Sequence, residues 1–205
     1  MYWNFYNPEN KSINYQTENL LQHMGETFKA FVDAIVPRTP GLAIEYGRIQ
    51  YYGAVDLHTD EYLIMSLNNY YIPLAEPTAE MLDIAADQLI LIQANEGLLN
   101  FSMFQGGGTF AALAPKDRLR ALTLLEQLQV NLATLPIPFQ DDPGFVLSVT
   151  GLLNRFTMMG YYSEWSGYGS TRLETPNQRI LEFFPLAWEQ VGYPGPSLGY
   201  RALRG

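Results

Sequence analysis

The fold is decided by residues 28–58, which read FKAFVDAIVPRTPGLAIEYGRIQYYGAVDLH. An apolar helical repeat runs into Pro37, Pro40 and Gly41, and an aromatic-rich segment follows. Because a proline disfavours the helical conformation in the residue before it, the first helix is expected to end at Val36. The sequence therefore predicts a helix, a hard stop and a second element that turns back on the first.

The helix before this stop is predicted over residues 17–36, with Thr17 as its N-cap. Its apolar residues recur at helical spacing and form one wide face: Leu20, Leu21, Met24, Phe28, Phe31, Val32 and Ile35. After the stop, residues 42–55 show a weaker helical stripe that Gly47 and Gly53 interrupt. A second helix is predicted there.

Further helices are expected where a capping residue or a proline precedes an apolar repeat. Asp142 followed by Pro143 is the clearest such pair. Gly97 and Gly160 are natural stops, and Thr175 with Pro176 predicts a short last helix. The longer predicted helices cover residues 60–72, 77–95, 115–132 and 143–160. No sustained strand pattern or internal repeat is present, so the expected fold is an all-α, single-domain bundle of six or seven helices.

A chain of 205 residues with 47% hydrophobic residues can bury one sizeable core, so residues 1–205 are predicted to form a single helical domain. Within it, residues 1–16 are an aromatic arm, 17–160 the helical core and 161–205 an irregular aromatic segment. Both ends lack apolar periodicity. Each is expected to lie on the core of this chain or on another chain.

Composition excludes several function classes. The net charge of −9 disfavours nucleic acid and anionic lipid as partners. With no cysteine, the chain cannot form disulfides, use thiol catalysis or bind a Cys-ligated cluster. The start carries no signal-peptide pattern and no apolar run approaches a membrane span, so a cytoplasmic location without membrane insertion is expected. Charged residues make up only 16%, which indicates that a partner covers part of the surface.

Acidic residues and a histidine cluster at DLHTDE (56–61), where Asp56, His58, Asp60 and Glu61 are candidate metal ligands. A helix start explains the same residues. Thr59 would cap the helix, and the two acidic residues after it would lie beside the positive end of the helix dipole. We favour the helix start.

Three other features have two interpretations each. Arg38 is either an anion clamp or a partner in a surface ion pair. The glycines of FSMFQGGGTF (101–110) lack a phosphate-loop pattern and favour a flexible loop. The aromatic residues after Gly160 could line a sugar-binding cleft with Glu164, but glycoside hydrolysis needs a second carboxylate that the sequence does not identify.

Three motifs together resemble the gluconate 2-dehydrogenase subunit 3 family. They are the helix that runs into AIVPRTPG (34–41), the helix start PKDRLRAL (115–122) and WEQVGYPGP (188–196). The matching residues are Pro37, Arg38, Pro40, Gly41, Arg118, Trp188, Gly192, Tyr193, Pro194 and Gly195. The resemblance spans about residues 20–196.

The resemblance implies a helical, non-catalytic small subunit without a cofactor of its own. Its partner would be a large flavoprotein of the glucose-methanol-choline oxidoreductase type that oxidises a sugar or sugar acid, and the small subunit would assist its assembly, maturation or export. Many members begin with a twin-arginine export signal, which this sequence lacks. Either the signal was trimmed, the partner carries it, or the complex stays in the cytoplasm, and the starting Met favours the last. The interface candidates are Arg38, Tyr161, Tyr162, Trp165, Trp188 and Tyr193. The alternative is a stand-alone helical enzyme or carbohydrate-like binding protein that uses the aromatic C-terminal segment.

Overall fold

The computed structural model describes residues 8–195, and this part of the chain is all-α, as predicted. It contains eight α-helices, four short 3-10 helices and no β-strand. The α-helices are α1 (Pro8–Ile35), α2 (Ala43–Tyr46), α3 (Thr59–Asn68), α4 (Ala75–Leu91), α5 (Thr109–Ala112), α6 (Pro115–Glu126), α7 (Pro143–Tyr162) and α8 (Leu186–Val191). The 3-10 helices are η1 (Pro40–Leu42), η2 (Arg48–Tyr51), η3 (Leu132–Thr134) and η4 (Trp165–Thr171).

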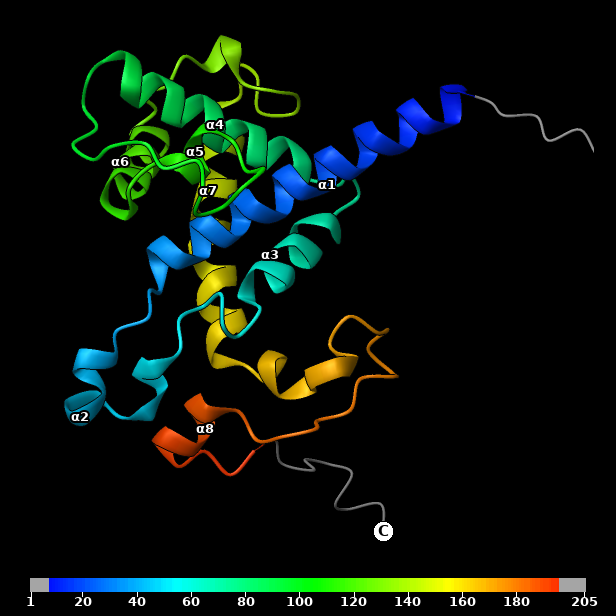
Figure 1. Cartoon of the computed structure of the whole chain (residues 1–205), viewed down its shortest axis with the longest axis vertical. Helices are drawn as coiled ribbons and strands as arrows, with labels where there is room; N and C mark the ends of the chain where they lie inside the picture. Colours follow the sequence, from blue (N-terminus) through cyan, green and yellow to red (C-terminus); the bar gives the residue numbers. More distant parts are fainter. Residues whose placement is uncertain (1–7, 196–205) are drawn as a thin grey trace, which may run out of the picture.

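Helix α1 is longer than predicted, and its first part extends away from the body of the molecule (Figure 1). The predicted arm is therefore wrong for residues 8–16, and Thr17 lies inside the helix rather than at its cap. Pro8 suits the first turn, and no glycine or proline follows it before Gly25. The arm residues before Pro8 lie outside the described part. At its other end α1 stops at Ile35, next to the predicted Val36.

The segment after the prolines is not the continuous helix that we predicted over residues 42–55. It consists of η1, α2 and η2, and Gly47 separates the last two with a φ of +88°. A positive φ ends a right-handed helix, and glycine adopts it without steric cost. The chain still turns back as expected, because the Thr39 N–H donates to the Gln50 carbonyl at 3.0 Å.

Helices α3, α4 and α6 are each shorter than predicted. Thr59 is the first residue of α3, and its hydroxyl caps nothing. Helix α4 ends at Leu91, before Gln93 adopts a φ of +54°, so Gly97 is not the stop. Helix α6 ends at Glu126, shortly before Leu128 adopts the same φ. Apolar residues beyond these ends pack in loops, which periodicity cannot distinguish from helix.

Helix α7 begins as predicted, because the Asp142 carboxylate accepts a hydrogen bond from the Phe145 N–H at 2.9 Å. It continues past Gly160 to Tyr162. The short helix predicted at Thr175 is wrong: a turn lies there, and the last helix is α8.

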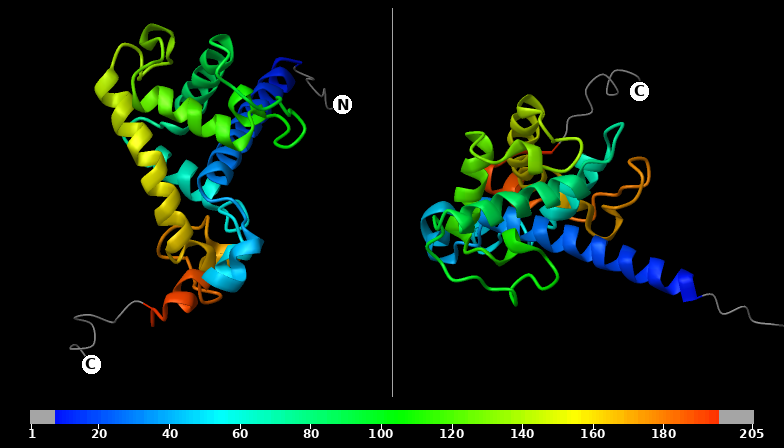
Figure 2. Two further views of the ribbon diagram at one scale, coloured as in Figure 1. Left: turned by 90° about the vertical axis from the view of Figure 1, so that its left-hand side faces the viewer. Right: turned by 90° about the horizontal axis from the view of Figure 1, so that it is seen from above.

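A single hydrophobic core joins these helices. Helix α7 runs along most of the molecule and packs against α3 and α6, while α1 crosses the body and contacts α3, α5 and α6 (Figure 2). The largest buried apolar side chains are Trp165, Phe28, Phe31, Leu63, Leu67, Met81, Leu82, Leu89, Phe110, Leu113 and Phe139. Helices α4 to α6 form one end of the molecule, and α2, η2 and α8 form the other (Figure 1). Among the described residues, no helix has both the length and the hydropathy of a membrane span.

Candidate functional site

In the predicted acidic cluster, Asp56 and Glu61 form hydrogen bonds and ion pairs within the chain. Asp56 accepts hydrogen bonds from Arg38 Nε at 3.0 Å and from the Gly53 N–H at 2.8 Å. Glu61 pairs with Arg172 at 2.5 and 3.0 Å, and His58 Nδ1 lies 3.5 Å from a Glu61 oxygen. Within residues 8–195, no three acidic or histidine side chains converge on a point where they could hold a metal ion.

The pKa values of the acidic residues follow from these contacts. Burial alone would raise the pKa of Asp56, but the hydrogen bonds from Arg38 and Gly53 lower it below its usual value. The pKa of Glu61 is also lowered, because the Arg172 guanidinium outweighs the effect of burial. Asp60 has no guanidinium beside it, and burial raises its pKa to about 6. Arg38 is therefore a partner in an ion pair, which is one of its two predicted roles.

Three of the aromatic interface candidates are buried and connect segments of this chain. The Tyr161 hydroxyl donates to the carbonyl of Tyr52 at 2.8 Å. The Trp165 indole N–H donates to the His58 carbonyl at 2.7 Å, and the Trp188 indole N–H to the Tyr162 carbonyl at 3.0 Å. These rings are part of the core in this conformation, so only Arg38, Tyr162 and Tyr193 remain exposed among the candidates.

The exposed candidates Tyr162 and Tyr193 lie at one end of the molecule, where other large apolar side chains are also exposed, and we call this region the aromatic end. It lies where α2, η2, α8 and the last turn of α7 meet (Figure 1). Gln190 holds these elements together, since its side chain accepts from the Ile49 N–H at 3.2 Å and donates to the Tyr46 carbonyl at 2.6 Å. The exposed side chains of the aromatic end are Ile44, Tyr46, Tyr51, Tyr162, Val191 and Tyr193.

A second group of exposed apolar side chains, which sequence reasoning missed, lies at the end of α4 and on the long loop between α4 and α5. Its exposed side chains are Leu91, Ile92, Leu98, Phe101 and Met103. The signal was present in the sequence LLNFSMF (98–104), where apolar residues continue beyond a plausible helix end. The prediction of α4 up to residue 95 placed part of this surface on a helix and obscured it.

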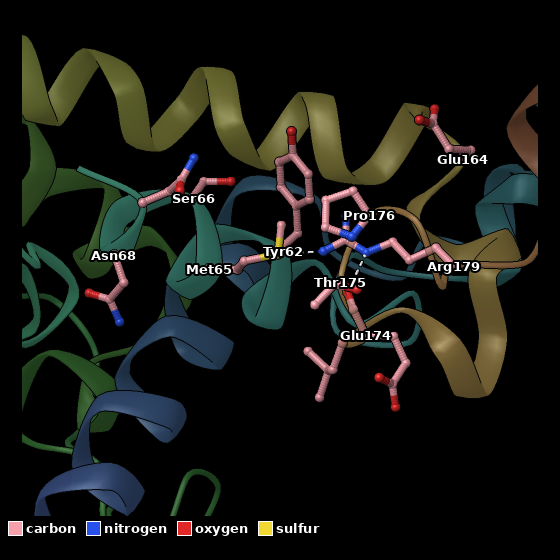
Figure 3. Close-up of a pocket in the computed structure, with 11 residues that line it drawn as sticks. Tyr62, Met65, Ser66, Asn68, Glu164, Glu174, Thr175, Pro176 and Arg179 are labelled. Atoms are coloured by element: carbon pink, nitrogen blue, oxygen red, sulfur yellow. Dashed lines mark hydrogen bonds between the residues drawn. The ribbon is translucent and has the colours of Figure 1, made fainter. Parts of the chain in front are cut away.

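A groove of about 730 Å³ lies between α3 and the irregular segment after α7 (Figure 3). Its walls come from two stretches of the chain, with Tyr62 as the aromatic residue that lines it and Glu164 at one side. The lining residues are Tyr62, Met65, Ser66, Asn68, Asn69, Glu164, Leu173, Glu174, Thr175, Pro176 and Arg179. The Arg172–Glu61 ion pair fastens the irregular segment to α3 beside the groove.

The residues that carry the family resemblance mostly have structural roles. Arg118 is buried beneath α1, where its guanidinium donates to the Ala30 carbonyl at 3.1 Å. Gly192 ends α8 with a φ of +67°, and Gly195 has a φ of +92°. Pro37 and Pro40 occupy the stop after α1. A turn or a buried contact explains each of these positions within the chain itself.

Comparisons with protein families, with curated proteins and with solved structures give no match to this chain.

Proposed function

We propose that this protein is a non-catalytic accessory subunit of a flavin-dependent sugar or sugar-acid dehydrogenase complex. Its partner is a large flavoprotein of the glucose-methanol-choline oxidoreductase type, which it helps to assemble, mature or be exported. The observation that carries the proposal is the aromatic end. The resemblance of the three sequence motifs supplies the class of partner.

The chemistry of the aromatic end suits a protein interface. Ile44 and Val191 are 98% and 76% exposed, and the elements at this end of the molecule also carry exposed tyrosines. Large apolar side chains gain free energy when a partner removes them from water. Tyrosine adds a ring of large contact area and a hydroxyl that can bond across the interface, which is why it is enriched at interfaces.

The aromatic end is also held in a fixed shape from beneath. Tyr161 anchors η2 to α7, Trp188 anchors α8 to the end of α7, and Gln190 joins α8 to α2 and η2. A surface that is already ordered loses less conformational entropy when it binds. The buried aromatic candidates therefore support the interface indirectly, by positioning its exposed residues.

One observation favours a second candidate function, the stand-alone small-molecule binding protein. The groove beside α3 has a volume within the range of ligand sites, and Glu164 lines it as the carbohydrate hypothesis requires. The aromatic residues of the C-terminal segment contribute little to it, because Trp165 is buried and only Tyr62 lines the groove. Stacking on sugar faces therefore has weak support.

Purification of the tagged chain from its native host, with a visible absorption spectrum, separates the two candidates. The accessory-subunit proposal predicts a flavin spectrum and one much larger companion chain in fixed ratio. A colourless protein that elutes alone at every ionic strength would overturn the proposal and favour the stand-alone function.

A further inference from the structure

We infer that the groove beside α3 is a binding site for a small organic carboxylate with an apolar body, and that Arg179 is its anion contact. This inference does not depend on the flavoprotein partner. It is drawn from the state of the Arg179 side chain and from the groups around it (Figure 3).

Arg179 is partly buried in the groove wall, and its guanidinium is held in place. Its Nε–H donates to the Glu174 carbonyl at 3.0 Å, and its carbon Cζ lies 5.4 Å from the centre of the Trp165 ring and 5.9 Å from that of Tyr168. Cation–π contacts and a backbone acceptor fix the plane of the group without neutralising it. The charge is thus oriented before any ligand binds.

The acceptors available to this guanidinium are poor. Arg179 Nη2 donates to the Met65 sulfur at 3.0 Å, and a thioether is a weak acceptor. Among the side chains of residues 17–195, no carboxylate lies within ion-pair distance of Arg179, whereas Arg38, Arg118, Arg120 and Arg172 each have one. Arg48 and Arg155 have no ion pair there either, but neither lines the groove. Arg179 differs from the four paired arginines because its acceptors are a thioether and a backbone carbonyl, so a ligand carboxylate would be a stronger acceptor for its terminal nitrogens.

The two glutamates of the groove do not fill this role. Glu164 lies well apart from the guanidinium in Figure 3, and its carboxylate accepts a hydrogen bond from the Tyr168 hydroxyl at 3.3 Å. Glu174 is exposed to solvent, and only its backbone carbonyl contacts Arg179. A ligand carboxylate can therefore approach the nitrogens from the groove side, where two parallel N–H···O bonds match its geometry.

The rest of the lining defines the body of the ligand. Met65, Leu173 and Pro176 supply apolar surface to the lining. Figure 3 shows Met65, Pro176 and the Tyr62 ring close to the Arg179 guanidinium. A carboxylate with a short aliphatic or aromatic chain would place its charge on the guanidinium and its carbons against these residues. The size and polarity of the groove thus fit a small organic acid better than a naked inorganic anion.

The test is isothermal titration of the full chain with 4-methylpentanoate and phenylpropanoate, each compared with its uncharged amide. Both acids are expected to bind with a millimolar or lower dissociation constant, and each amide at least about tenfold more weakly. Binding should also change the fluorescence of Trp165, since the indole lies against the guanidinium. Failure of both acids to bind at about 10 mM would overturn the proposal.

Two variants locate the contact. Arg179→Gln should weaken binding of both acids at least about tenfold, because the ion pair is lost. Arg155→Gln, which removes an exposed arginine on α7 outside the groove, should leave binding unchanged. Met65→Leu keeps the apolar wall and removes the sulfur acceptor, so it should retain binding of both acids. The comparison of each acid with its amide in the wild type tests the charge contact even if Arg179→Gln disturbs the fold. Equal affinity in Arg179→Gln and the wild type, or loss of binding in Arg155→Gln, would contradict the assignment.

Discussion

The guanidinium of Arg118 on α6 donates to the main-chain carbonyl of Ala30 on α1 across 3.1 Å, deep in the core. The Nη2 of Arg118 donates to the Ala111 carbonyl at 2.9 Å, and its Nη1 lies 3.2 Å from the carboxylate of Asp33, which is the counter-charge. Arg118 is only 1% exposed. This one side chain thereby joins α1, α5 and α6. Arg118, which is one of the residues that match the family motifs, is thus a structural cross-link.

Removal of this cross-link should destabilise the fold strongly. Arg118→Leu removes the hydrogen bonds to both carbonyls and leaves Asp33 without its counter-charge, and we expect a loss of about 3 to 5 kcal/mol in the free energy of unfolding. Arg118→Lys keeps the charge but not the fork of donors, and should lose about half as much. Urea denaturation followed by circular dichroism measures both. A loss below about 1 kcal/mol in Arg118→Leu would show that the buried contacts contribute little.

Protonation of Asp60 should make the protein more stable in mild acid than at neutral pH. Burial raises the pKa of Asp60 to about 6, above its value in the unfolded chain, so the ionised carboxylate costs stability above pH 6. Asp60→Asn should therefore stabilise the fold by roughly 2 kcal/mol at pH 7, and the gain should disappear near pH 4. Unfolding free energies across this pH range test the prediction. An equal gain at both pH values would mean that burial of the charge is not the cause.

Alanine at Gly108 should destabilise the fold and alanine at Gly151 should stabilise it, because the surroundings of the two glycines differ. A Cβ at Gly108 would collide with the Asp83 carboxylate, which accepts from the Phe110 N–H at 2.8 Å and pairs with His23 at 2.6 Å. Gly108→Ala should cost about 2 kcal/mol or more, and the pKa of His23, raised by Asp83, should fall. Gly151 lies within α7 with open space around it, so Gly151→Ala should gain up to about 1 kcal/mol. Thermal unfolding and NMR titration of His23 check both results. A stabilised Gly108→Ala variant would contradict the packing described around Asp83.

The Arg172–Glu61 pair should matter more than the Arg38–Asp56 pair. Both Arg172 and Glu61 are partly buried, and their two hydrogen bonds fasten the irregular segment to α3. Arg172→Gln should increase hydrogen exchange and proteolysis over residues 173–184. Arg38 is largely exposed, and exposed ion pairs contribute little, so Arg38→Gln should lower the free energy of unfolding less than Arg172→Gln does. Equal protection of residues 173–184 in the wild type and Arg172→Gln would show that other contacts hold the segment.

The sequence predicted those features that depend on local chemistry. The Asp142–Pro143 start of α7 and the stop before Pro37 follow from capping and from the geometry of proline, and both are confirmed. Helix ends without such residues were misplaced, as at Leu91 and Glu126, where non-glycine residues adopt a positive φ. Glutamine and leucine are not typical of that conformation, so the sequence around Gln93 and Leu128 does not predict it.

The candidate site depended on contacts between distant residues, which the sequence could not show. The buried partner of Trp165 is the carbonyl of His58, and that of Trp188 is the carbonyl of Tyr162. An irregular segment has no periodicity, so its sequence does not show whether an aromatic residue is buried in the core or exposed at an interface. Likewise, the sequence does not show which arginines have a carboxylate partner. The lack of an ion pair at Arg179 is therefore visible only in the structure.

The accessory-subunit account is tested most directly by partner capture with two matched variants. Ile44→Asp with Val191→Asp places two charges on the aromatic end, at side chains so exposed that the fold should be unaffected. Leu98→Asp with Phe101→Asp makes the same change on the exposed loop between α4 and α5. The account predicts that the first double variant loses the flavin-containing partner, whereas the second retains it as the wild type does. Retention of the flavoprotein by a folded Ile44→Asp, Val191→Asp variant would contradict the account.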